Sequence, residues 1–267
     1  MGTLFRIVLH APDEAAAKRA FDGAFAIARD LDARLSDYKP DSELNRLCRA
    51  GEGTVSAELF GVLRLAREVA RKTGGAFDPA AGALIRLWRR GRAAGSLPKE
   101  EAIAAARKAS GWRHVEFDRR RRRVRLTAPG IQLDLGGIAK GWAADRMLDC
   151  LRGAGIDQAL VAASGDLAIG AAPPGRRGWR VSLGEGGPVE ELRHCAVSTS
   201  GPAEQSAVLN GVRYSHIVDP RTGWALRESK PVTVVAARGA LADALATALS
   251  VEPGLRLDSW RKVRVLR

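Results

Sequence analysis

The sequence predicts an α+β fold with a largely antiparallel sheet core and flanking helices. Long segments of the first half carry apolar residues at helical spacing. The second half consists mainly of short β-like runs separated by glycine and proline. These runs do not alternate regularly with helices, which argues against a doubly wound parallel sheet.

The first half begins with an alternating apolar pattern, which predicts a strand. Helical spacing then predicts two helices, and Asp41 or Ser42 is suited to cap a short third one inside the loop between them. A glycine-rich break with Pro79 ends the second long helix. In order, we expect a strand over 1–10, a helix over 13–35, a loop over 36–47, a helix over 56–72, a break over 74–79 and a short helix ending near Trp88.

The rest of the chain changes from helical spacing to β-like runs after Gly153. Only the last element, rich in alanine and leucine, returns to a helical pattern. In order, we expect a linker over 90–98, a helix over 100–109, a strand pair over 115–127, a strand over 131–135, a helix ending near Gly153, β-runs over 159–169, 179–183, 194–198, 208–217 and 232–236, and a helix over 240–251.

The chain is strongly basic, with a formal net charge of +13 over 267 residues. Most of this excess is scattered arginine, and the one run, Arg119 to Arg123, is interpreted as a solvated hairpin tip. Aromatic residues make up only 5% of the chain, which argues against a base-stacking surface. We therefore expect no nucleic-acid partner, although the charge keeps that alternative open, and favour a small anionic ligand.

No window approaches the roughly 18 consecutive apolar residues of a membrane span. No basic and then apolar signal segment precedes the first strand, so we expect a cytoplasmic protein from the chain as given. A longer natural N-terminus would instead place it in the periplasm or at a membrane anchor. The three cysteines are far apart and fit neither a disulfide framework nor a zinc site.

Residues 131–147 form the most informative stretch, read as a short apolar strand, a turn with Gly136 and Gly137, the cation Lys140 and then a helix. This order places backbone N–H groups and a helix N-terminus beside a lysine, which suits a phosphate or a pyrophosphate. The G-x-x-x-x-G-K-[ST] and G-x-G-x-x-G spacings are absent. An ordinary strand-to-helix junction is the alternative.

Three further clusters lie at the ends of predicted strands. Ser164-Gly165-Asp166 is either a cluster with a chemical role, through its carboxylate, or an ordinary turn, which is favoured for this segment taken alone. The group Ser198, Thr199, Ser200 and Gly201 is either an ordinary turn or a place for phosphate or a flavin edge. His216 and Asp219 precede a Pro-x-x-Gly turn, where either side chain can take part in proton transfer. The alternative for His216 is a hydrogen-bonded turn histidine.

Asp243 and Thr247 lie four residues apart, and therefore on one face of the last predicted helix. Both carry hard oxygen donors of the kind that Mg²⁺ prefers. An aspartate on a buried helix rich in alanine and leucine costs several kcal/mol unless it is paired or bound to a metal. A polar stripe facing solvent is the alternative.

Taken in order, these clusters resemble the FAD:protein FMN transferases, the ApbE-like flavin transferases. The resemblance covers nearly the whole chain and is most specific at three places, the glycine turn, the His-Ile-Val-Asp-Pro turn and the Ala-Asp-Ala helix. The matching segments are Met1-Gly2-Thr3, Tyr38-Lys39-Pro40-Asp41-Ser42-Glu43-Leu44, Gly75-Ala76-Phe77-Asp78-Pro79, Asp134-Leu135-Gly136-Gly137-Ile138-Ala139-Lys140-Gly141, Ser198-Thr199-Ser200-Gly201, Ser215-His216-Ile217-Val218-Asp219-Pro220-Arg221-Thr222-Gly223 and Ala242-Asp243-Ala244-Leu245-Ala246-Thr247.

The resemblance implies a single domain over residues 1–267, an ApbE-like and T-fold-related arrangement of two closely packed lobes with the active site between them. It also implies a Mg²⁺-dependent enzyme that moves FMN from FAD onto a threonine or serine hydroxyl of an acceptor protein and releases AMP. Two alternatives remain, an FAD pyrophosphatase that yields FMN and AMP, and a non-catalytic FAD-binding protein.

By the same resemblance, the backbone carbonyl of Gly137 joins Asp243 and Thr247 as a Mg²⁺ ligand, and Lys140 lies beside FAD. Either His216 or Asp219 is expected to assist deprotonation of the incoming hydroxyl. The residues similar to those that line the flavin and adenine are Met1, Glu43, Leu44, Asn45, Asp78, Ser198, Thr199, Ser200 and Gly201.

Overall fold

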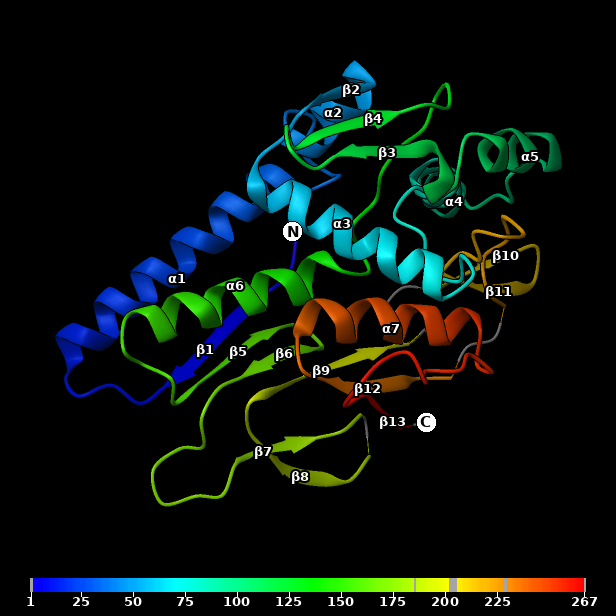
Figure 1. The fold of residues 1–267 in the computed structure, drawn as a ribbon. Coiled ribbons are helices and arrows are strands. Elements are labelled where there is room, and N and C mark those ends of the chain that lie inside the picture. The colour runs from blue at the N-terminus through cyan, green and yellow to red at the C-terminus, as the bar shows by residue number, and fades with distance from the viewer. Residues whose placement is uncertain (1, 185, 202–205, 228–229, 267) are drawn as a thin grey trace.

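A computed structural model describes residues 2–184, 186–201, 206–227 and 230–266, and it confirms the α+β class with antiparallel sheets. The main sheet has six strands in the order β1-β5-β6-β9-β12-β13, and every neighbouring pair is antiparallel (Figure 1). Its strands are β1 (Phe5–Leu9), β5 (Ala159–Ala163), β6 (Asp166–Ile169), β9 (Cys195–Ser200), β12 (Val232–Ala236) and β13 (Arg264–Leu266).

Helices α6 (Ala139–Gly153) and α7 (Gly239–Val251) pack against one face of this sheet, as Figure 1 shows. Outside them lie α1 (Glu14–Leu35), which packs on α6, and α3 (Ala57–Lys72), which packs on α7. The hairpin of β7 (Trp179–Ser182) and β8 (Val189–Leu192) lies on the other face of the main sheet. There, Val181 of β7 packs in a small apolar cluster with Ile169 and Val197 of the sheet. The core therefore has helices on one side of the sheet and a hairpin on the other.

A second group of elements surrounds a small antiparallel sheet in the order β2-β4-β3. A separate hairpin, β10-β11, packs near α4, since Tyr214 and Trp88 share one apolar cluster. These elements are α2 (Glu43–Ala50), β2 (Glu52–Thr54), α4 (Gly82–Ala93), α5 (Glu100–Lys108), the 3₁₀ helix η1 (Trp112–His114), β3 (Val115–Asp118), β4 (Arg123–Leu126), β10 (Ser206–Leu209) and β11 (Val212–Ser215).

Glycines allow α6 and α7 to meet backbone to backbone. A Cβ on Gly141 would lie 2.2 Å from the carbonyl oxygen of Gly239, a distance that no side chain tolerates. The buried carboxylate of Asp145 accepts hydrogen bonds from the backbone N–H groups of Gly239 and Ala240, at 2.8 and 3.1 Å. This contact caps the first turn of α7 and fixes its position along α6.

The helices predicted from periodicity are present, and Ser42 rather than Asp41 caps α2. The strand predicted over residues 131–135 is wrong. That segment pairs with no strand among the described residues. Its backbone bonds go to separate loops and to the start of α6, among them those from the Gly82 N–H to Gln132 and from the Asp134 N–H to Pro79. An apolar run that is buried by neighbouring loops has the same composition as a buried strand, and only its pairing distinguishes the two.

The short helix predicted to end near Trp88 continues to Ala93 as α4, so the linker predicted over 90–98 is wrong in its first part. Gly91 weakens the helix by its propensity, but it lies where a Cβ would meet the Ser96 carbonyl, and the helix ends before Gly95, whose φ is +64°. The β-run over 208–217 is instead a hairpin whose turn contains Asn210 and Gly211. No helix among the described residues combines the length and the apolar character that a bilayer span needs.

Candidate active site

The glycine turn and the start of α6 form one compact structure. The Asp134 carboxylate accepts a hydrogen bond from the Gly136 N–H at 2.7 Å, which closes the turn. Lys140, in the first turn of α6, folds back so that its ammonium donates to the Gly136 carbonyl at 3.1 Å. The turn therefore holds a cation directly over its own backbone.

Helix α7 brings Asp243 and Thr247 to this turn. The Asp243 carboxylate accepts a hydrogen bond from the Gly141 N–H at 3.2 Å and lies 3.3 Å from the Lys140 ammonium. A Cβ on Gly137 would lie 2.8 Å from the Thr247 hydroxyl, so only glycine allows the turn to approach so closely. The structure thus brings together the three residues predicted to hold a metal, together with Lys140.

Asp166, at the start of β6, reaches the same lysine from the sheet. Its carboxylate lies 3.2 Å from the Lys140 ammonium and accepts a hydrogen bond from the Ser198 hydroxyl. Burial, and then the Asp166 charge, raise the pKa of Asp243 to about 7. Burial disfavours the charge on Lys140, but Asp243 and Asp166 outweigh it and raise the pKa of the lysine.

This cluster matches the chemistry of a divalent cation. When both carboxylates are ionised, the two negative charges and the single ammonium leave a net charge of −1, which a further cation would neutralise. The donors nearby are a carboxylate, a hydroxyl and backbone carbonyls, the hard oxygens that Mg²⁺ prefers. Within the described part of the chain, no group of three His, Cys, Asp or Glu side chains gathers as a metal site, so a histidine- or thiolate-rich centre is not formed there.

The strand end of β9 uses its side chains for packing. Thr199 shares a hydroxyl hydrogen bond of 2.9 Å with Thr233 of β12, and Ser200 accepts one of 3.1 Å from Ser250 of α7. Gly201 lies against the backbone of Pro231. Apart from Ser198, which bonds to Asp166, the structure does not bring this group to Lys140.

Glu43, Leu44 and Asn45, at the start of α2, lie in another part of the second group of elements. The Glu43 carboxylate accepts hydrogen bonds from Ser56, and Leu44 is buried in the main apolar core. The Asn45 amide donates to the carbonyls of residues 37 and 39 and accepts from Arg86. Asn45 also lines a cavity of about 300 Å³ with Tyr38, Arg86 and Gln132 among its other walls.

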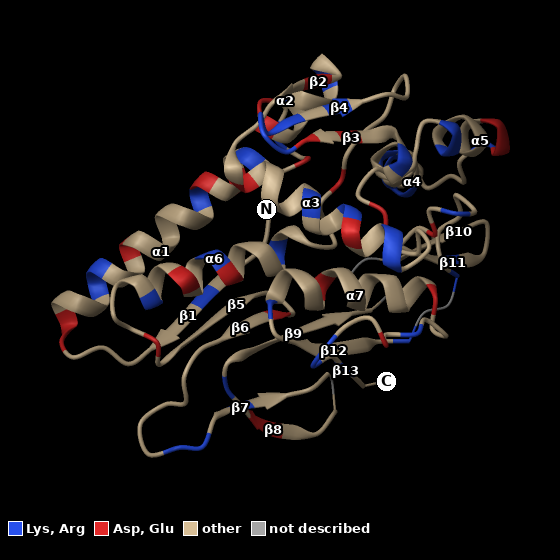
Figure 2. Cartoon of the chain, viewed as in Figure 1, with Lys and Arg blue, Asp and Glu red and all other residues tan. Residues whose placement is uncertain are grey.

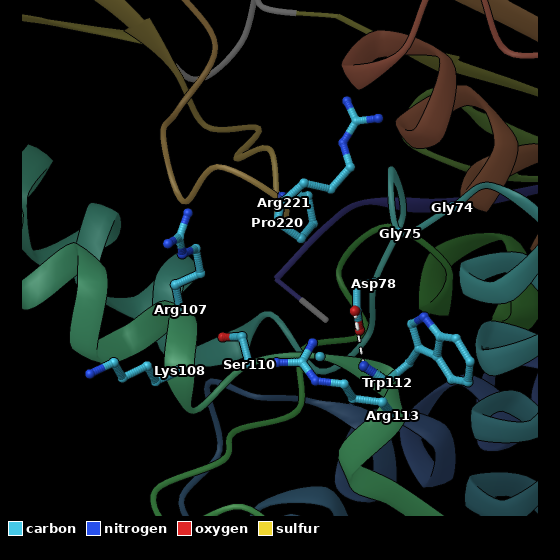
Figure 3. A pocket seen from close by; sticks show the side chains of 11 residues that line it. Gly74, Gly75, Asp78, Arg107, Lys108, Ser110, Trp112, Arg113, Pro220 and Arg221 are labelled. Carbon is cyan, nitrogen blue, oxygen red and sulfur yellow. Dashed lines mark hydrogen bonds between the residues drawn. The ribbon is translucent and has the colours of Figure 1, made fainter.

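Asp78 and the turn after His216 lie at a second cavity, of about 420 Å³ (Figure 3). The half-buried Asp78 carboxylate accepts hydrogen bonds from the N–H groups of Ala80 and Trp112. Asp219 is paired with Arg221 at 3.0 Å, and Arg221 lines the cavity. His216 follows β11 directly and is half-buried, and Met1 lies outside the described residues.

Residues 1–262 match the model of the ApbE family. The chain belongs to the ApbE family. A protein of Treponema pallidum named FAD:protein FMN transferase is 35% identical over 94% of this chain and 76% of its own length. Two solved structures also superpose well. The ApbE protein of Thermotoga maritima has a TM-score of 0.85 at 31% identity, covering 95% of this chain and 84% of its own. The flavin transferase ApbE of Vibrio cholerae has a TM-score of 0.86 at 29% identity, and the match covers 100% of this chain and 90% of the Vibrio chain.

Two residues of this ApbE-family site were not predicted as functional. For Asp166 the sequence offers a cluster with a chemical role but no assigned function, because a carboxylate after glycine at a strand end is also common in turns. Asp134 was read only as part of the glycine turn, yet burial and the neighbouring Asp37 raise its pKa to about 6, and Arg89 lies 3.4 Å away. The available signal for Asp166 was its place at the end of a fully apolar run, where an unpaired carboxylate is costly.

Proposed function

We propose that this chain is a Mg²⁺-dependent FAD:protein FMN transferase, which attaches FMN to a threonine or serine hydroxyl of an acceptor protein and releases AMP. Family membership and the names of the relatives support the reaction. The observation that carries the proposal is the position of the Lys140 ammonium between Asp166 and Asp243, directly at the glycine turn. This is where a diphosphate and its cation would meet a helix N-terminus.

In this proposal, Asp243, Thr247 and the Gly137 carbonyl hold Mg²⁺. The ion, when bound, neutralises the diphosphate charge that repels an incoming hydroxyl. Lys140 contacts phosphate oxygens, and Asp166 keeps its ammonium directed at the turn. The close approach of Gly137 to Thr247 places the turn's backbone next to the Thr247 hydroxyl, so both can face one ion.

The reaction is balanced by a single displacement. The acceptor oxygen forms a bond to the phosphorus of the FMN half, the bond from that phosphorus to the bridging oxygen breaks, and AMP leaves with that oxygen. The hydroxyl proton passes to a base on the His216 to Asp219 turn. The Asp219 carboxylate is already occupied by the side chain and the backbone N–H of Arg221. We therefore assign the proton to His216 and the support of the turn to Asp219.

The remaining predicted FAD contacts are also proposals. The side chains of Glu43, Asn45 and Asp78 are bonded within the protein, so they would shape the FAD site by fixing the loops around it. Leu44 would do the same from the core. The end of β9 would contribute to the FAD site through the bonds that hold it in place, made by Ser198, Thr199, Ser200 and Gly201. Met1 is proposed as a flavin contact on the resemblance alone.

The test incubates the protein with FAD, MgCl₂ and candidate acceptors, and reads flavin transfer by in-gel fluorescence and AMP release by chromatography. Asp243→Asn should reduce transfer by about 100-fold or more, the size expected when a group that stabilises developing charge is lost. Asp22→Asn, the same change on the exposed face of α1, is the matched control and should transfer at the wild-type rate.

Three outcomes contradict the proposal. Full transfer by Asp243→Asn would exclude the proposed metal site. AMP release that is rapid without an acceptor would identify an FAD pyrophosphatase instead. FAD that binds and persists unchanged with MgCl₂ and acceptor present would identify a flavin-binding protein without this activity.

A further inference from the structure

The cavity of about 420 Å³ beside Asp78 has an unusual charge. Arg107 and Lys108 line it from the last turn of α5, Arg113 from η1, and Arg221 from the turn after β11. Figure 2 shows the charges of α5 separated, acidic at one end and basic toward the other. Figure 3 shows Arg107, Arg113 and Arg221 around the same central space, although they belong to three separate segments. Its lining carboxylate, Asp78, is already bonded to two backbone N–H groups.

Only part of this positive charge is balanced locally, since Asp78 interacts with the charge of Arg113 and Arg221 has carboxylate partners of its own. Arg221 pairs with Asp219 and Glu252, at 3.0 Å each. Among the residues that the structure describes, Arg107, Lys108 and Arg113 form no salt bridge. The dipole of α5 accounts for cations in its last turn, but it does not account for Arg113 and Arg221 at the same cavity. The cavity is therefore arranged to receive negative charge.

One loop connects the cavity to the candidate phosphate site. The ring of Phe77 lies 3.3 Å from the position of a Cβ on Gly137, and the next residue, Asp78, lines the cavity. Arg221 approaches Gly75 on the same loop, with 3.8 Å between its Cγ and the position of a glycine Cβ. The loop that carries Phe77 and Asp78 thus contacts the glycine turn through one residue and lines the basic cavity through the next.

We propose that this cavity receives acidic side chains that flank the target hydroxyl of the acceptor protein. The inference rests on the proposed transferase function, in which the acceptor must bring its hydroxyl up to the diphosphate at Lys140. The surface directly beside that point is then covered by acceptor residues. Since four cations line it, glutamate or aspartate near the target threonine or serine would bind there in preference to neutral or basic residues.

The test uses the full chain and two fluorescein-labelled peptides, each with one threonine, flanked in one by four glutamates and in the other by four glutamines. Binding is measured by fluorescence anisotropy, and flavin transfer to each peptide is measured separately with FAD and MgCl₂. The variant is Arg107→Ala/Lys108→Ala. The matched control, Arg120→Ala/Arg121→Ala, removes the same charge at the tip of the β3-β4 hairpin, at the other end of β3 from η1.

We expect the glutamate peptide to bind wild type more tightly than the glutamine peptide. The Arg107→Ala/Lys108→Ala variant should weaken binding of the glutamate peptide by about 3- to 10-fold, the range expected for two exposed ion pairs. Its affinity for FAD, measured by flavin fluorescence, should be unchanged, and the control should bind both peptides as wild type does. The preference should shrink as salt is raised.

Equal binding of the two peptides by wild type would overturn the inference, as would an equal loss in the control variant. A loss of FAD affinity in Arg107→Ala/Lys108→Ala would also overturn it, because the cavity would then belong to the FAD site. Equal flavin transfer to both peptides leaves the transferase function standing and removes the docking site. Selective binding of the glutamate peptide without any transfer leaves the acidic-peptide site standing and removes the transferase function.

Discussion

Gly141→Ala tests whether the backbone contact between α6 and α7 holds the candidate site together. A Cβ at this position would meet three backbone atoms of the other helix, at 2.2 Å from the Gly239 oxygen, 2.4 Å from its carbon and 2.8 Å from the Ala240 nitrogen. Backbone atoms cannot rotate away as a flexible side chain does, so the helices must separate.

The cost follows from this geometry. Adding a methyl group to a packed interior costs about 1–3 kcal/mol, and a backbone clash belongs at the upper end, about 3 kcal/mol. Each kcal/mol lowers the Tm of a protein of this size by about 2–4 °C, so we expect Gly141→Ala to lower it by about 6–12 °C. Separation of the helices also moves Asp243 away from Lys140, so FAD affinity should fall as well.

Gly153→Ala is the matched control, because this glycine lies at the end of the same helix and a Cβ there meets nothing within 4 Å. Alanine is the better helix former by about 1 kcal/mol, so the control should keep or raise the Tm. Both variants are compared by calorimetry and by flavin fluorescence titration. Equal Tm values for Gly141→Ala and wild type would refute the idea that this close approach sets the helix spacing.

Two further predictions concern buried carboxylates. Asp145→Ala removes the acceptor for two N–H groups of α7 and should lower the free energy of unfolding by about 2–3 kcal/mol in urea denaturation. The control Asp149→Ala breaks partly exposed ion pairs and should lower it by less than about 1 kcal/mol. Equal effects of the two changes would contradict the capping role of Asp145. Asp134 has a folded-state pKa of about 6, above its ordinary value of 3.8, so the native state holds more protons between these values and stability should fall as pH rises from about 4 to 6. The full difference is about 3 kcal/mol. Asp134→Asn should make this part of the urea-midpoint profile less steep, while the raised pKa of Asp243 keeps a slope of the same sign up to about pH 7; an unchanged slope would refute the assignment.

The features that the sequence predicted correctly are those that depend on interactions between residues close together in the chain. The α1 and α3 helices follow from the spacing of their apolar residues, and Asp13 and Ser56 cap them through side-chain bonds to N–H groups three residues on. The shared face of Asp243 and Thr247 is a matter of helical geometry alone. These features depend on neighbours within a few positions along the chain, so one sequence contains the whole signal.

The sequence by itself thus determined the helices, the glycine turn and the hard oxygen pair on α7. The tertiary structure alone decided that residues 131–135 do not join a sheet, that Asp166 of β6 pairs with Lys140, and that α5, η1 and the turn after β11 share one basic cavity. These outcomes depend on which distant segments meet in space. Composition and spacing describe each segment separately, whereas pairing, burial and charge balance arise only once the segments are packed together.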